Sequence, residues 1–164
     1  MQLQIKNKYF SLGGSSLVRD MQGNDVLKVK GKFFTVTQKK FIEDLQGNVH
    51  YIVRNKFWRF IGYSAFICDK KGEIICRVKR KVLSLHDSYK LQSPFGEITF
   101  RGNILGFDYH IYLNDEEIGH VARKIDFRDS FVLDLKDGYD EKFFVALVIA
   151  MDNITDRKDS NRRD

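Results

Sequence analysis

The sequence of 164 residues has few cysteines and prolines: it contains two Cys and one Pro. Cys68 and Cys76 lie on either side of the turn DKKG. If this turn closes a hairpin, the two cysteines sit diagonally on one face of the sheet, which is a poor geometry for a disulfide. Buried, reduced thiols are predicted instead. The N-terminal segment MQLQIKNKYF also lacks the apolar region of a secretory signal, so we expect a cytoplasmic location.

The sequence also lacks the motifs of common catalytic, phosphate and metal sites. The glycine-rich stretch LGGSS has neither the lysine nor the following helix of a phosphate-binding loop. No G-x-S-x-G nucleophile motif is present. Metal-ligand spacing is missing among the histidines, which are His50, His86, His110 and His120. His110 shares a strand face with Tyr112 and is interpreted as a residue of the wall. We therefore expect a protein that is not an enzyme, with no cofactor and no metal site.

The composition is that of a folded domain. Apolar residues make up 43% of the chain and include fourteen Phe, which excludes a disordered protein. A chain of this length forms one domain whose core needs no disulfide or metal. The net charge of +6 is compatible with an anionic partner such as a membrane surface or nucleic acid. It is also compatible with the ordinary charge that keeps a small domain soluble.

A turn motif recurs along the chain, in which glycine follows an acidic or polar residue by three positions. The copies are RDMQG, EDLQG, CDKKG and QSPFG, and their glycines are 24, 25 and 24 residues apart. In such a turn the Asp side chain caps the backbone, and the glycine takes the left-handed conformation that lets two strands rejoin. The flanking segments are β-prone, as in SAFIC before DKKG and EIICRV after it. The repeat predicts successive antiparallel hairpins.

Strand-forming segments cover most of the chain. The expected strands are 2–7, 15–20, 25–31, 34–43, 48–55, 63–69, 73–81, 87–93, 96–103, 107–114, 117–125 and 130–136. A meander of this length must roll up or close to hide its edges. The predicted fold class is therefore mainly β, a closed twelve-stranded antiparallel barrel built from hairpins.

A different pattern follows the last strand. Asp140 opens a segment in which nine consecutive apolar residues, Phe143–Met151, leave no polar face. This run is too short to span a bilayer, which needs ~20 residues, and a helix that is apolar all round is a buried helix. A barrel of more than about eight strands would be hollow without a filling element. We predict a central plug helix at 140–154, a single domain at 1–154, and a charged, disordered tail at 155–164.

Several short motifs occur in an order that is typical of one family. They are K-x-K-Y-F at Lys6–Phe10, D-x-x-G followed by V-x-G-K-x-F at Asp20–Phe34, D-x-x-G followed by a lysine at Asp44–Lys56 and Asp69–Lys81, and ALVIAMDNI at Ala146–Ile154. Through them, about residues 3–154 resemble the LURP-one-related proteins. This family lies within the tubby C-terminal-like superfamily, which also includes the phospholipid scramblases. The compact length is similar to that of the short bacterial members.

The resemblance implies a twelve-stranded barrel around a central hydrophobic C-terminal helix, in agreement with the strand count. Within the superfamily, tubby domains hold phosphoinositide headgroups with basic residues on the barrel, and scramblases are membrane proteins. The present sequence lacks the Pro-rich N-terminal segment and the Cys-rich palmitoylation stretch of the scramblases. The resemblance therefore favours a binding module over a scramblase.

Basic residues alternate with apolar ones along three of the expected strands. Since residues two apart share a face, and Val29, Val53 and Val78 point inward, the neighbouring cations point outward. The predicted site for an anionic headgroup consists of Lys28, Lys30, Lys32, Arg54, Lys56, Arg77, Lys79 and Lys81. The cations Lys39, Lys40, Arg59 and Lys124 are expected to extend this band. We expect the band to gather at the end of the barrel wall that lies away from the D-x-x-G turns.

These cations leave several functions open. The leading hypothesis is a non-enzymatic binding or scaffold module that attaches peripherally to anionic phospholipid, each basic side chain near the bilayer contributing ~1 kcal/mol. The alternative is a protein-interaction scaffold without lipid binding, and phospholipid scrambling is less favoured. Nucleic-acid binding is also less favoured, because the aromatics alternate away from the cations. Outward lysines are equally explained by solubility and by protection of strand surfaces. The oligomeric state stays open.

Overall fold

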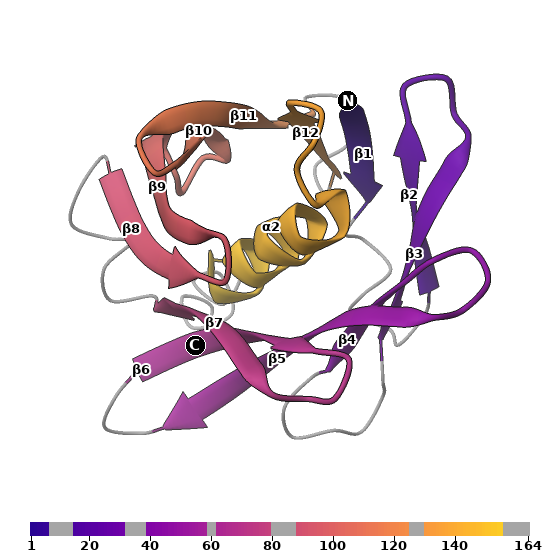
Figure 1. Cartoon of the computed structure of the whole chain (residues 1–164), viewed down its shortest axis with the longest axis horizontal. Coiled ribbons are helices and arrows are strands. Elements are labelled where there is room, and N and C mark those ends of the chain that lie inside the picture. The colour runs from indigo at the N-terminus through magenta and orange to yellow at the C-terminus, as the bar shows by residue number, and fades with distance from the viewer. Residues whose placement is uncertain (7–14, 32–38, 59–61, 80–87, 125–129, 156–164) are drawn as a thin grey trace, which may run out of the picture.

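The protein is a β-sheet curled around one helix (Figure 1). The computed structural model describes residues 1–6, 15–31, 39–58, 62–79, 88–124 and 130–155, with the backbone alone for 56–58, 62 and 63. The strands within these residues are β1 (Gln2–Lys6), β2 (Ser15–Asp20), β3 (Asp25–Gly31), β4 (Lys40–Glu43), β5 (Val49–Trp58), β6 (Gly62–Asp69), β7 (Ile74–Lys79), β8 (Ser88–Ser93), β9 (Gly96–Asn103), β10 (Asp108–Leu113), β11 (Glu116–Arg123) and β12 (Ser130–Leu135). The helix is α2 (Glu141–Thr155).

All twelve strands belong to one antiparallel sheet, which confirms the predicted fold class. The strand order is β7-β6-β5-β4-β3-β2-β1-β12-β11-β10-β9-β8, so β1 pairs with β12 and the edges are β7 and β8. Between these edges no ladder forms within the described residues. Instead, the Lys79 backbone N–H donates to the Tyr89 hydroxyl at 2.9 Å. The barrel is therefore nearly closed: where a closed barrel was predicted, a side-chain hydrogen bond takes the place of a backbone ladder between β7 and β8.

The D-x-x-G turns are built as the sequence predicted. The Asp44 Oδ1 atom accepts a hydrogen bond from the Asn48 N–H at 2.8 Å, and the Gly47 N–H donates to the Asp44 carbonyl at 3.1 Å. Gly47 has a φ of 89°, a left-handed value that suits glycine. Asp20 and Asp69 accept equivalent bonds at 2.8 and 2.9 Å. The three turns join alternate strand pairs, so they lie at the same end of the barrel.

The Asp44 turn gives the stability of the fold a predictable dependence on pH. Hydrogen bonding from Asn48, with a smaller contribution from His50, lowers the pKa of Asp44 from 3.8 to about 2. Because the folded pKa lies below the unfolded one, this contribution to stability is present above about pH 4 and is lost as the pH falls toward 2. As the pH falls between these values, the free energy of unfolding measured in urea should decrease more steeply for the wild type than for Asp44→Asn. Parallel losses in the two proteins would contradict the linkage.

Helix α2 fills the centre of the barrel, as predicted (Figure 1). It begins one residue later than expected because Asp140 is its cap: Oδ1 accepts hydrogen bonds from the N–H groups of Lys142 at 3.0 Å and Phe143 at 3.1 Å. The other oxygen of Asp140 accepts a bond from the Tyr51 hydroxyl at 2.7 Å. Every residue from Phe143 to Ile154 is buried. The rest of the predicted tail, 156–164, lies outside the described residues.

The two cysteines are free thiols, and the prediction that they share one face is wrong. A bulge shifts the register, so that Ile67 pairs with Cys76 whereas Cys68 pairs with Ile74. Cys76 therefore points into the core with Ile67. There burial raises the pKa of the Cys76 thiol to about 12. Cys68 points outward, toward Arg54. Burial raises the pKa of the Cys68 thiol, and the charge of Arg54 opposes this rise.

Candidate functional site

The predicted cations lie on the outer wall of one half of the sheet. The cations Lys28, Lys30, Arg54, Arg77 and Lys79 are half-buried or exposed, whereas the valines beside them are fully buried. This alternation is the one that the sequence predicted. Lys32 and Lys81 lie outside the described residues, and for Lys56 only the backbone is described. The described cations therefore come from the three alternate strands β3, β5 and β7.

Strand pairing places Arg54 and Arg77 on the two strands that flank Phe66. Phe66 on β6 pairs with Arg54 on β5 and with Arg77 on β7. The Arg77 guanidinium carbon lies 5.4 Å from the centroid of the Phe66 ring, and its Nη2 donates to the Ser64 Oγ at 3.3 Å. A guanidinium held over a ring keeps its planar fork of donors oriented, which suits phosphate oxygens. Lys79 pairs with Ser64, one position further along the same face.

The two lysines of β3 are less equivalent than the sequence suggested. Lys28 lies directly across from Glu43 on β4, and opposite charges in such a pair attract each other. Lys30 lies across from Phe41 and is exposed. Lys30, Arg54, Arg77 and Lys79 all lie toward the ends of their strands that are distant from the D-x-x-G turns. We call these four residues, together with Phe66, the basic face.

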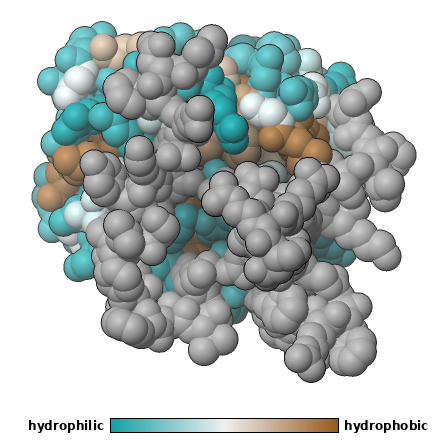
Figure 2. All heavy atoms as spheres, turned by 180° about the vertical axis from the view of Figure 1, so that it is seen from behind, coloured by the Kyte–Doolittle hydropathy of each residue, from teal (hydrophilic) through white to brown (hydrophobic). Residues whose placement is uncertain are grey.

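The outer wall around the basic face is partly apolar. Across β4, β5 and β6 the outward residues in register with Lys30 are Phe41, Ile52 and Cys68. Phe66 is only 8% exposed although it points away from the core. Seen from behind, the described surface is mostly hydrophilic with separated hydrophobic patches (Figure 2). The basic face therefore mixes the predicted outward cations with apolar side chains.

The prediction that Lys40 extends the outer band is wrong. Lys40 is buried on the inner side of β4, where its Nζ donates to the Asn153 Oδ1 of α2 at 2.5 Å. The Asn153 Nδ2 in turn donates to the Asn55 Oδ1 at 3.3 Å. The alternation of Lys40 with the inward Ile42 was the sequence signal that could have identified its position. Lys124 follows β11, in the other half of the sheet, so it does not join the band either.

Further polar groups are buried near the C-terminal end of α2. Asp152 is 2% exposed, and Tyr109 on β10 is fully buried. The Tyr109 hydroxyl has no hydrogen-bond partner among the described residues. Burial, and to a smaller degree the charge of Asp152, raises the pKa of Tyr109. These groups are enclosed in the core, so they are not offered to an external ligand.

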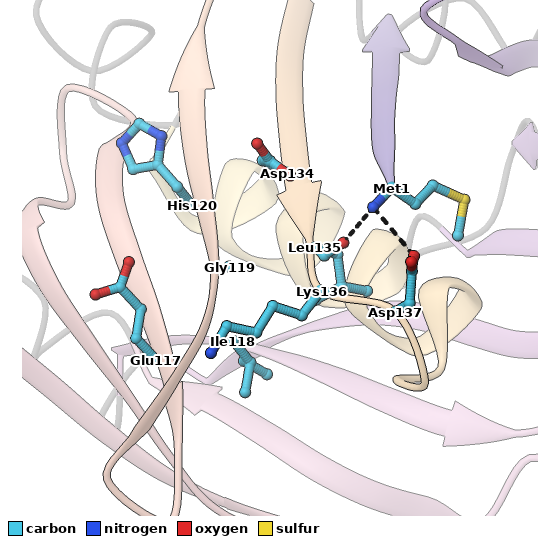
Figure 3. A pocket seen from close by; sticks show the side chains of 9 residues that line it. All are labelled: Met1, Glu117, Ile118, Gly119, His120, Asp134, Leu135, Lys136 and Asp137. Carbon is cyan, nitrogen blue, oxygen red and sulfur yellow. Dashed lines mark hydrogen bonds and ion pairs between the residues drawn. The ribbon is translucent and has the colours of Figure 1, made fainter.

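A shallow groove of about 440 Å³ lies beside β11 and β12 (Figure 3). The Met1 amine points into it and contacts the Leu135 carbonyl oxygen and the Asp137 carboxylate. The acidic side chains of the lining outnumber its basic ones, and the lining residues are Met1, Glu117, Ile118, Gly119, His120, Asp134, Leu135, Lys136 and Asp137. An acidic groove is a poor site for an anionic headgroup.

Two further findings concern the parts of the chain that the structure describes. In these parts, no three His, Cys, Asp or Glu side chains are placed to hold a metal ion together. The described helix does not reach the length and hydrophobicity needed to cross a membrane.

The architecture defines a class of protein: a β-barrel plugged by its own C-terminal helix, with a mixed basic and apolar patch on its wall. The chain belongs to the LURP-one-related family, whose model matches residues 1–152. The resemblance seen in the sequence motifs is thereby confirmed. Family membership and fold together support a non-enzymatic binding module as the general class.

Comparison with individual proteins adds little. A crystal structure of a protein from Arabidopsis thaliana is similar to this chain at 16% sequence identity and a TM-score of 0.48, over 93% of this chain and 90% of that one. No curated protein sequence matches the chain significantly.

Proposed function

We propose that the protein is a cytoplasmic binding module that attaches peripherally to anionic phospholipid headgroups through the basic face. The observation that carries the proposal is the placement of Arg54 and Arg77 on either side of Phe66, in register across three neighbouring strands. Two guanidinium groups spaced by one strand can contact neighbouring phosphate groups of a bilayer. Lys30 and Lys79 add exposed charge at the same end of the wall.

The energetics of such attachment are modest. Each cation near an anionic membrane surface contributes ~1 kcal/mol, so the four cations of the basic face supply about 4 kcal/mol. An attraction of this size corresponds to weak, reversible binding. Salt weakens the binding further, because the Debye length is only about 8 Å at physiological ionic strength. Phe41 and Ile52, which are half-buried between the cations, would rest at the headgroup level. The expected mode is therefore surface attachment.

Vesicle co-sedimentation tests the proposal. The wild type is expected to bind vesicles that contain phosphatidylserine, to release them as salt is raised, and not to bind phosphatidylcholine alone. A variant carrying Lys30→Glu with Lys79→Glu should bind at least about 30-fold more weakly, because about 2 kcal/mol of attraction is lost. Both lysines are on the outer wall, so circular dichroism should show an unchanged fold.

The turn after β6 provides the matched control. Lys70 and Lys71 are exposed at the opposite end of the same strands, and Lys70→Glu with Lys71→Glu changes the net charge by the same amount. This control should bind like the wild type if the basic face is the site. Equal weakening in both variants would show attraction by net charge alone, and equal binding of the wild type to neutral and anionic vesicles would exclude the proposal.

A further inference from the structure

Two histidines stand side by side on the outer face of β10 and β11. His110 and His120 are direct cross-strand partners, and their ring centroids are 4.6 Å apart. Their side chains are 50% and 35% exposed, so both rings are accessible from solution. The spacing of the histidines along the sequence predicted no metal site, whereas the pairing of the strands brings these two rings together.

Each ring is bound to a carboxylate through one nitrogen. The His110 Nδ1 lies 2.9 Å from the Glu117 Oε1, and the His120 Nε2 lies 2.9 Å from the Asp108 Oδ1. Since an ionised carboxylate only accepts hydrogen bonds, these nitrogens carry the ring hydrogens. In the neutral rings, the His110 Nε2 and the His120 Nδ1 are left with lone pairs. Histidines that bind metals generally donate the hydrogen of their other ring nitrogen to a carboxylate, a backbone carbonyl or a water.

We propose that His110 and His120 together bind one divalent transition-metal ion such as Zn²⁺ or Cu²⁺. With Zn–N bonds of about 2.0–2.1 Å in tetrahedral geometry, two imidazoles on one ion hold their centroids roughly 5 Å apart. The observed separation of 4.6 Å is close to this value. Imidazole nitrogen is a preferred ligand of both ions. Because no third ligand converges with the pair among the described residues, water completes the coordination.

The surrounding charges favour a cation at this position. In addition to the two carboxylates on the rings, Asp134 of β12 lies directly across from His120. Two nearby cations are held by other groups. The Arg101 guanidinium on β9 lies 4.4 Å from the Tyr112 ring and 3.5 Å from the Asp115 carboxylate, and the Lys136 Nζ lies 3.3 Å from the Glu116 carboxylate. The histidine pair also lies in the other half of the sheet from the basic face, so the proposal is independent of phospholipid binding.

Titration of the untagged protein with zinc chloride, followed by calorimetry and by the NMR signals of the histidine rings, tests the proposal. We expect one ion per chain and shifts of the His110 and His120 ring signals. His110→Gln and His120→Gln should each weaken binding at least tenfold, since each removes one of two protein ligands. Glu117→Gln should weaken it about 10-fold or more, as carboxylates that orient metal-binding histidines do. Magnesium should not compete, because it prefers oxygen ligands.

His50→Gln is the matched control. The His50 Nε2 also pairs with a carboxylate, the Asp44 Oδ2 at 3.2 Å, but in a turn of the other half of the sheet. This variant should bind zinc like the wild type. The proposal is overturned if the His110→Gln, His120→Gln double variant binds as tightly as the wild type, or if the wild type shows no ring shifts. Circular dichroism would confirm that the variants are folded, since both rings lie on the surface.

Discussion

Leu147→Asp is expected to leave the protein unfolded under conditions in which the wild type is folded. Leu147 lies near the middle of α2 and is 1% exposed, and its helix neighbours are buried as well. Loss of the leucine costs about 2–5 kcal/mol of packing, and burial of a carboxyl group adds several more. The sum is comparable with the whole stability of a small domain, about 5–15 kcal/mol. Thermal melts followed by far-UV circular dichroism measure the effect.

Leu147→Met is the control for this prediction, because it conserves volume and polarity. It should cost less than about 1.5 kcal/mol and leave the melting transition cooperative. If Leu147→Asp melted with the wild type, the helix would have to lie outside the barrel in solution. The helix as the filling of the barrel is thus open to a direct test.

The second large effect is expected at the buried polar end of the plug. Asn153→Leu removes the oxygen that accepts a hydrogen bond from the Lys40 Nζ, deep between α2 and β4. A charged group that loses a buried partner costs about 1–3 kcal/mol or more. We therefore expect Asn153→Leu to lower the free energy of unfolding by at least about 2 kcal/mol in urea titrations. Lys30→Met, on the outer wall, should change it by less than about 0.5 kcal/mol.

A double variant separates the hydrogen bond from simple packing. Lys40→Met together with Asn153→Leu removes both ends of this hydrogen bond, so that no charged amine is left beside the leucine. The double variant should therefore be more stable than Asn153→Leu alone, with a coupling energy of about 0.5–3 kcal/mol. Additive losses would show that Lys40 and Asn153 act independently.

Local chemistry made several features predictable. Asp44 and Gly47 define their turn through contacts between residues at most four apart, so the pattern alone was sufficient. Asp140 caps α2 in the same local way. The outward direction of Arg54 follows from its place beside Val53, because the period of two is a property of every strand. For each of these features, the nearest neighbours in the chain supply the deciding interaction.

Other features depended on pairings that the chain pattern does not contain. A bulge reverses the face on which Cys68 stands relative to Cys76. Lys40 was interpreted as surface charge because its acceptor, Asn153, is more than a hundred residues away along the chain. The sequence likewise gave no reason to place His110 beside His120. A shift of one residue in register would separate two such rings onto opposite faces.

The amino-acid sequence by itself determined the kind of fold: hairpins at the D-x-x-G turns, strands between them, and a helix so apolar that the barrel must enclose it. It determined these because turn capping, strand alternation and hydrophobic burial act between near neighbours or on composition. Only the tertiary structure decided which cations share a face, that Arg54 and Arg77 flank Phe66, and that two histidines meet on the opposite wall. Register and barrel closure set these contacts, and both result from the packing of distant segments.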